Sequence, residues 1–251
     1  YLYSFKDIYV LTYLFDGSPM SLYLRSEGLT FHHKSLSGDG HRLIEHCEVN
    51  EADIKERLRS LVTVYEGPRN KIGHKNGRAH PLSSSWYDHV LRTNPRVLET
   101  FRSSVEKWFE RDAKTPSKEN AWTCFNKVRR QLSGKGYGRG HIAVNAKATN
   151  DYREKVSLAY LASIFFHPVV RKFFESRGLV VHEELYALSE MLQWIWRSRI
   201  REGQPINVFI PSERMRGLLI EWLNTDNSSL LLSKRDGALA REPSPLRLTP
   251  K

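Results

Sequence analysis

The strongest chemical signal in the sequence is the run EMLQWIWRSRIR at residues 190–201. If this run is helical, Gln193, Arg197 and Arg201 are spaced four residues apart and share one stripe of the helix surface. Like charges on one stripe repel each other, and a bound phosphate group would relieve that repulsion. The spacing therefore indicates an anion-binding stripe. The alternative is a solvent-exposed basic stripe that is partly paired with neighbouring glutamates.

Positive charge is in excess along the chain, with 39 Lys and Arg against 28 Asp and Glu and a formal net charge of +11. The basic residues cluster at 69–78, between Lys127 and Arg139, and again from Arg197 onward, and tryptophans lie among them. Mixed basic and aromatic clusters suit phosphate neutralisation and base stacking. We therefore expect a DNA or RNA partner, with Lys127, Lys135 and Arg139 among the contacts. A basic surface with its tryptophans in the core is the alternative.

Other chemical motifs are excluded by their spacing. The glycine-rich run GKGYGRG at 134–140 lacks the Ser or Thr after the lysine, and the helix, that a P-loop needs. It predicts an exposed turn or a backbone contact with nucleic acid. His32 and His33 are adjacent, so they would face apart on a strand, and no Cys/His ligand spacing occurs. No metal site and no nucleophile motif is expected.

The pattern of apolar residues predicts alternating strands and helices. Strands are expected at 7–15, 122–125, 141–144, 157–164 (where a helix is nearly as well supported) and 206–210, with a further pair at 30–31 and 42–47. Helices are expected at 21–29, 50–64, 95–109, 126–132, 168–177 and 183–201, and from a Ser212 cap to Leu223. Strands joined by crossover helices imply a parallel α/β sheet.

Composition divides the chain into three parts. Residues 1–80 form a partial N-terminal α/β segment, which ends in a Gly- and Pro-rich basic stretch. Residues 86–223 contain the main alternating pattern. Residues 224–251 have little apolar periodicity and are expected to be a disordered basic tail.

The sequence also predicts a compartment. No apolar run reaches the roughly 18 residues of a membrane span, and Tyr1–Phe15 has no signal-peptide pattern. Cys47 and Cys124 cannot make a disulfide framework. We expect a cytoplasmic location without membrane attachment, and a chain that is a fragment of a longer reading frame.

The spacing Gln193-x-x-x-Arg197-x-x-x-Arg201, followed by a strand at 206–210, resembles motif VI of superfamily 2 helicases of the DEAD/DEAH type. In that family the arginines of the motif reach a nucleoside triphosphate across an interdomain cleft. Trp196 stands where glycine is usual, and Arg201 falls one residue later than the second arginine of the family pattern. The role therefore transfers best to Arg197, then to Gln193, then to Arg201.

Further segments are similar to other helicase motifs in the same order. The segment 144–152, which contains Thr149 and Asn150, resembles motif V, and the segment that contains Thr123 resembles motif IV. The resemblance implies that these three residues contact nucleic acid. The segment 9–15 is similar to the strand that carries motif III in the first RecA-like domain. The amino-acid sequences of these runs are more similar to those of helicase-like proteins of phages and mobile elements than to those of DEAD-box proteins.

The resemblance implies a RecA-like parallel sheet flanked by helices at 86–223, the second RecA-like domain, preceded by the end of the first domain at 1–80. It implies a C-terminal part of an ATP-dependent helicase or translocase. The Walker lysine and the DExx carboxylates do not occur in this sequence. ATP and Mg²⁺ would therefore be used only within a longer protein that supplies the missing first RecA-like domain, and this chain alone should not hydrolyse ATP. The alternatives are a non-catalytic nucleic-acid-binding protein or decayed helicase remnant of a mobile element, and an unrelated basic α/β protein.

Overall fold

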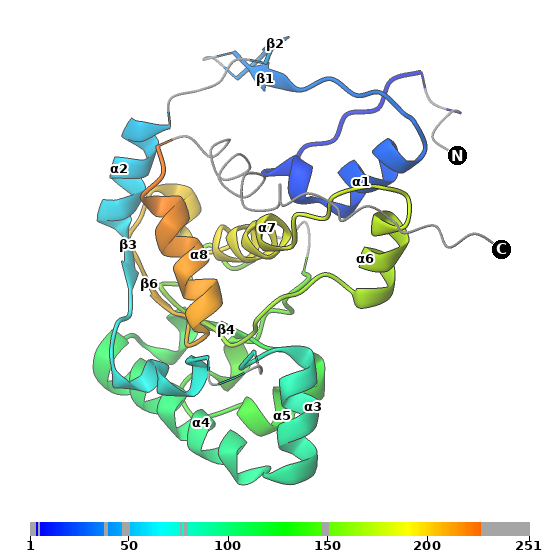
Figure 1. Ribbon diagram of the computed structural model, residues 1–251. Coiled ribbons are helices and arrows are strands. Elements are labelled where there is room, and N and C mark those ends of the chain that lie inside the picture. Colours follow the sequence, from blue (N-terminus) through cyan, green and yellow to red (C-terminus); the bar gives the residue numbers. More distant parts are fainter. Residues whose placement is uncertain are drawn as a thin grey trace, which may run out of the picture.

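The computed structural model describes residues 4, 6–37, 40–46, 51–75, 77, 80–146 and 151–226. The described part is built on a parallel sheet of four strands in the spatial order β3–β6–β5–β4 (Figure 1). The strands are β3 (Val62–Val64), β4 (Asn120–Thr123), β5 (Ser157–Tyr160) and β6 (Ile206–Phe209). Helices flank this sheet, so the expected α/β fold with a parallel sheet is confirmed.

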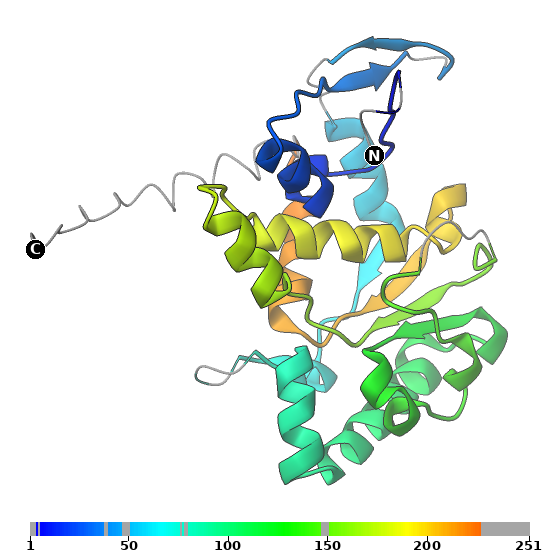
Figure 2. The same cartoon turned by 90° about the vertical axis from the view of Figure 1, so that its right-hand side faces the viewer.

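Helices cover both faces of the sheet (Figure 2). One face carries α2 (Ala52–Leu61), α7 (Glu183–Ile195) and α8 (Glu213–Leu223), and the other carries α3 (Ser84–Thr93), α4 (Arg96–Lys107) and α5 (Arg129–Leu132). Farther from the sheet lie α1 (Pro19–Ser26), α6 (Pro168–Glu175) and the antiparallel pair β1 (Lys34–Leu36) and β2 (Leu43–Glu45). Short helical turns occur at Phe15–Gly17, Pro68–Gly73, Trp108–Ala113, Ser117–Glu119, Asn126–Val128, Gly138–Gly140 and Arg199–Glu202.

Alternate residues of β4, β5 and β6 enter two different hydrophobic cores. Leu158 and Val208 pack with α2, α7 and α8, whereas Trp122, Ala159 and Phe209 pack with α3, α4 and α5. All five side chains are almost completely buried. A parallel strand that is buried on both faces needs apolar residues at successive positions, which explains the continuous apolar runs in the sequence.

Two expected elements end earlier than the apolar pattern predicts. The helix predicted at 183–201 ends at Ile195, because the Ser198 backbone is extended and the Arg199 amide donates to the Lys155 carbonyl in place of the Ile195 carbonyl. The helix predicted at 50–64 ends at Leu61, and the next three residues form β3, which pairs with β6. Both helix predictions are therefore wrong at their C-terminal ends. The sheet also extends across the expected boundary between 1–80 and 86–223.

The strand predicted at 7–15 is wrong. Residues 7–12 form no regular structure, and Ile8, Tyr9, Val10 and Leu11 are between 48% and 88% exposed. The β-branched and aromatic side chains of Ile8, Tyr9 and Val10 favour an extended backbone. A strand also requires a hydrogen-bonding neighbour, and none of the strands in the described ranges runs beside this segment.

Smaller differences concern three other segments. The strand expected at 30–31 is wrong, because residues 30–31 form no regular structure; the partner of the expected 42–47 strand, observed as β2, is instead β1 at Lys34–Leu36. The strand expected at 141–144 is reduced to one bridge between His141 and Trp122. Ser212 caps α8 as expected, because its side chain accepts a hydrogen bond from the Met215 backbone amide. Most of the expected tail, from residue 227 on, lies outside the described residues.

Substitution of Gly73 by alanine should lower the free energy of unfolding by about 1–3 kcal/mol. A Cβ atom at this position would lie 1.9 Å from the Pro211 carbonyl oxygen, which is backbone and cannot rotate away. Urea unfolding of Gly73→Ala measures the loss. Gly217→Ala is the matched control, because a Cβ at Gly217 meets nothing within 4 Å and alanine favours the helix by about 1 kcal/mol. Equal stability of the two variants would contradict the close contact at Gly73.

Candidate functional site

The carboxyl ends of the strands, where parallel α/β sheets usually bind ligands, are covered by the chain itself. The described residues of the segment 65–83, which follows β3, contact this end of the sheet. The Leu82 carbonyl accepts a hydrogen bond from the Ser163 backbone amide at 2.8 Å, and Leu82 is fully buried. The Lys75 amide donates to Glu213 at the start of α8 at 2.9 Å. This loop therefore takes the place in which a ligand would be expected.

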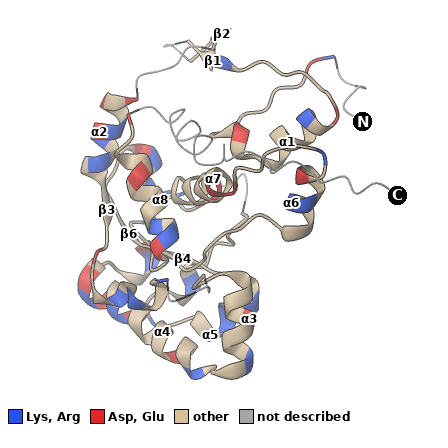
Figure 3. Cartoon of the chain, viewed as in Figure 1, with Lys and Arg blue, Asp and Glu red and all other residues tan. Residues whose placement is uncertain are grey.

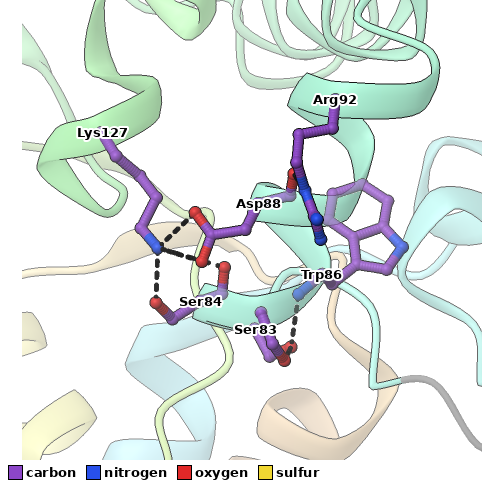
Figure 4. A network of polar contacts seen from close by, with 7 residues as sticks. Ser83, Ser84, Trp86, Asp88, Arg92 and Lys127 are labelled. Atoms are coloured by element: carbon purple, nitrogen blue, oxygen red, sulfur yellow. Dashed lines mark hydrogen bonds and ion pairs between the residues drawn. The ribbon is translucent and has the colours of Figure 1, made fainter.

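Beside this covered edge, Lys127 is held in a polar network with α3 (Figure 4). Its ammonium group lies 2.8 and 2.7 Å from the two carboxylate oxygens of Asp88 and 2.7 Å from the Ser84 hydroxyl. The network ties the segment after β4 to the first turn of α3, where Ser83 accepts a hydrogen bond from the Trp86 amide. Lys127 thus has a structural partner in this chain. The nucleic-acid contact expected for it stays a prediction.

The other residues expected to contact nucleic acid lie in different environments. Lys135 and Arg139 are exposed in the glycine-rich turn, where the Lys135 amide donates to Glu106 at 2.9 Å. Thr123 is fully buried at the end of β4. Thr149 and Asn150 lie outside the described residues. More generally, Lys and Arg are spread over several elements, among them α2, α3 and α6 (Figure 3).

The opposite edge of the sheet carries a cluster of arginines. After α7 the chain turns through residues 196–205 before it enters β6, and the Arg199 amide pairs with the Lys155 carbonyl just before β5. A cavity of about 230 Å³ opens here, lined by Arg153, Arg197, Arg201 and Glu202. We call it the arginine cavity. Three guanidinium groups and a single carboxylate give it the chemistry of an anion site.

Arg197 is the partly buried member of this cluster. One guanidinium nitrogen, Nη2, donates to the Ala146 carbonyl, and Nε is buried without a hydrogen-bond partner. Burial lowers the pKa of Arg197 from its usual value, while the charges of Glu190 and Tyr152 oppose this shift. An arginine remains charged in a protein, so this arrangement holds a cation with incomplete compensation.

The three residues expected to share one helical stripe are only partly brought together. Arg197 and Arg201 both line the arginine cavity although the helix ends before them. The Gln193 amide instead donates to the Ser189 hydroxyl at 3.1 Å, and Ser189 donates to the Tyr13 carbonyl. Gln193 thus takes part in a contact between α7 and the N-terminal segment. Its expected role at a nucleotide stays a prediction.

Arg153 lines the cavity but was not identified from the sequence. It follows directly after the segment 144–152 that resembles motif V. The signal that could have found it is a basic residue at the end of a segment already expected to contact nucleic acid. Its partners Arg197 and Arg201 are more than forty positions away, so spacing alone could not have joined them.

Comparison with known proteins identifies the chain as a Rossmann-like domain protein. Residues 56–223 match the family model described as the YonV C-terminal Rossmann-like domain, and the chain belongs to this family. A relative in Bacillus subtilis (strain 168), described as the SPbeta prophage-derived uncharacterized protein YonV, is 38% identical over 221 residues. The match covers 87% of this chain and 52% of the relative, so the chain spans about half the length of that protein. No solved structure matches.

Two further features are absent from the described residues. They contain no group of three or more His, Cys, Asp or Glu side chains that could hold a metal ion. Within the same ranges, every helix is too short or too polar to span a bilayer.

His141, which follows the glycine-rich turn, should make stability sensitive to acid. Burial, together with the charge of Arg129, lowers the pKa of this imidazole to about 4. Between pH 6.5 and 4 the unfolded chain therefore binds a proton that the folded chain does not, and the free energy of unfolding falls as the pH falls. Unfolding of the wild type and His141→Gln across this range should show a shallower decline in the variant. Identical slopes would mean that His141 titrates normally in the folded protein.

Proposed function

We propose that this chain is the second α/β domain of a nucleic-acid-dependent nucleoside triphosphate hydrolase of the helicase or translocase type. In this proposal the arginine cavity receives phosphate groups of a nucleotide bound between this domain and another. The observation that carries the proposal is the hydrogen bond from Arg197 to Ala146. It joins the two segments that resemble motifs V and VI, although they lie about fifty positions apart in the sequence.

The state of Arg197 supports an anionic ligand. A guanidinium group has five N–H donors, and a buried charge is costly unless it is paired. The lining of the cavity adds Arg153 and Arg201, together with Glu202. Phosphate oxygens can accept two parallel hydrogen bonds from one guanidinium group, so a polyphosphate chain is the ligand that suits this lining.

The arginine cavity fits a phosphate group and does not fit Mg²⁺. Three of its four lining side chains are cations, which repel a divalent cation. The acidic residues that hold Mg²⁺ would therefore belong to another part of a longer protein. This chain's own contribution would be positive charge placed beside the phosphoryl group.

Arginines in such a position act mainly on the transition state. Negative charge that develops on the transferring phosphoryl oxygens is stabilised by a fixed guanidinium group without reorganisation of solvent. Arginine fingers contribute roughly 10³–10⁵ in rate. Arg197 would be held in place for this role by its hydrogen bond to Ala146.

Replacement of Arg197 by alanine, in the intact protein that contains this chain, should lower ATP turnover by about 10³ or more. Nucleic-acid affinity should change little, because the cavity is not the expected contact surface. ATPase rate, nucleic-acid affinity and melting temperature are measured together. Arg171→Ala is the control, since Arg171 pairs with Glu175 at 2.7 Å on the exposed side of α6.

Two outcomes would contradict this role for Arg197. Normal turnover in Arg197→Ala would remove the nucleotide assignment. A large fall in melting temperature with the turnover of the remaining folded protein unchanged would show that Arg197 only anchors the segment at Ala146.

The second candidate is a non-catalytic nucleic-acid-binding protein, which the net charge of +11 and the exposed Lys135 and Arg139 favour. Under this candidate the intact protein would bind DNA or RNA and would not turn over ATP.

Nucleic-acid binding should be mainly electrostatic under either candidate function. Neutralised phosphates release counterions, so the affinity should fall by about an order of magnitude or more between 50 and 200 mM salt. Filter binding across a salt series measures this slope. Lys135→Ala and Arg139→Ala should each make it shallower, and a slope near zero in the wild type would exclude an electrostatic interface.

A further inference from the structure

A second cavity, of about 480 Å³, lies between α2 and the helical turn Arg199–Glu202. We call it the α2 groove. Its lining combines aliphatic and charged side chains: Ile54, Leu58, Leu61 and Ile200 with Arg57, Arg201 and Glu202. The groove shares Arg201 and Glu202 with the arginine cavity, so the two hollows meet at these residues.

The rim arginine is positioned by the backbone opposite it. Gly203 has a left-handed φ of 68°, and a Cβ atom there would lie 2.6 Å from Arg57 Nη2. Glycine at this position thus allows the turn after Glu202 and leaves room for the Arg57 guanidinium. That planar group lies beside the aliphatic residues of the groove, and a flat ring could stack against it there.

The wall residues differ in how accessible they are. Ile54 is 57% exposed on α2, whereas Leu58 and Ile200 are buried. The groove therefore has a buried apolar floor and an open mouth. Its volume falls within the roughly 300–1,000 Å³ of small-ligand sites, whereas the arginine cavity is smaller and more polar.

We propose that the α2 groove holds the base and sugar of the nucleotide whose phosphates occupy the arginine cavity. This inference rests on the proposed function. The aliphatic side chains of the groove, Ile54 above all, contact the base, and the planar Arg57 guanidinium group stacks against its face. Glu202, at the junction of the two hollows, accepts hydrogen bonds from the sugar hydroxyls.

Continuity and charge favour this occupant over a protein segment or a strand of nucleic acid. A nucleotide has one flat apolar ring and one polyanionic end, joined by a sugar, in the same order as the groove, Glu202 and the arginine cavity. A protein segment would have no need of an arginine cavity at the end of its groove. A nucleic-acid strand would place its phosphates along an extended track.

The test compares ATP with inorganic tripolyphosphate, which has the phosphates and lacks the base and sugar. Binding to the intact protein is measured by calorimetry for the wild type, Ile54→Ser and a control, Val169→Ser. Val169 is, like Ile54, an exposed β-branched residue on a helix; it is 69% exposed on α6 and does not line the groove. Ile54→Ser should weaken ATP binding by about tenfold, the loss expected for one apolar contact, and leave tripolyphosphate binding unchanged.

The outcomes separate this inference from the proposed function. Unchanged ATP affinity in Ile54→Ser, with turnover lost in Arg197→Ala, would overturn only the groove assignment. Weaker binding of single-stranded DNA or RNA to Ile54→Ser, without loss of ATP affinity, would assign the groove to nucleic acid. That result would also overturn the assignment of the groove to the base and sugar. Normal turnover in Arg197→Ala would overturn the proposed function and this inference with it. The melting temperature of Ile54→Ser confirms that the exposed substitution leaves the fold intact.

Discussion

Burial of the parallel sheet on both faces is the constraint on which the rest of the structure depends. Helices on each side make the faces inaccessible, so that a ligand can reach the strands only at their ends. At the carboxyl ends the Leu82 carbonyl accepts a hydrogen bond from the Ser163 amide, so that this loop covers the end of β5. The two hollows that share Arg201 lie at the amino ends. The candidate site therefore lies at the amino ends of the strands, because the loop after β3 covers the carboxyl ends.

The end of α7 likewise determines where the arginines of the candidate site lie. A continued helix would have placed the side chains of Arg197 and Arg201 one above the other on a single stripe of its surface. Because the Ser198 backbone is extended and the Arg199 amide bonds to Lys155, the chain leaves the helix there, and both arginines line one cavity together with Arg153. The end of the helix thus replaces a linear array of charges with a cluster around a cavity.

The sequence predicts those elements whose signals are local. The apolar run of β6 and the serine cap of α8 require only neighbouring residues to be recognised, and both are present. The pairing of Val62–Val64 with β6 depends on a partner about 140 positions away, and α2 conceals it because the apolar pattern runs on without a break. For the same reason the sequence indicates only some of the residues that line the arginine cavity. Arg197 and Arg201 stand in a recognisable spacing, whereas Arg153 joins them only through the fold.

The exposed segment Ile8–Leu11 has a practical consequence for work with this chain. Its side chains are large and mostly β-branched or aromatic, and its backbone amides and carbonyls pair with no strand in the described part of the structure. Segments of this composition add readily to the edges of other sheets, including those of neighbouring molecules in concentrated solution. Aggregation that grows with protein concentration, and that is relieved by a lysine or proline within this segment, would then originate outside the folded α/β unit and say nothing about the stability of its core.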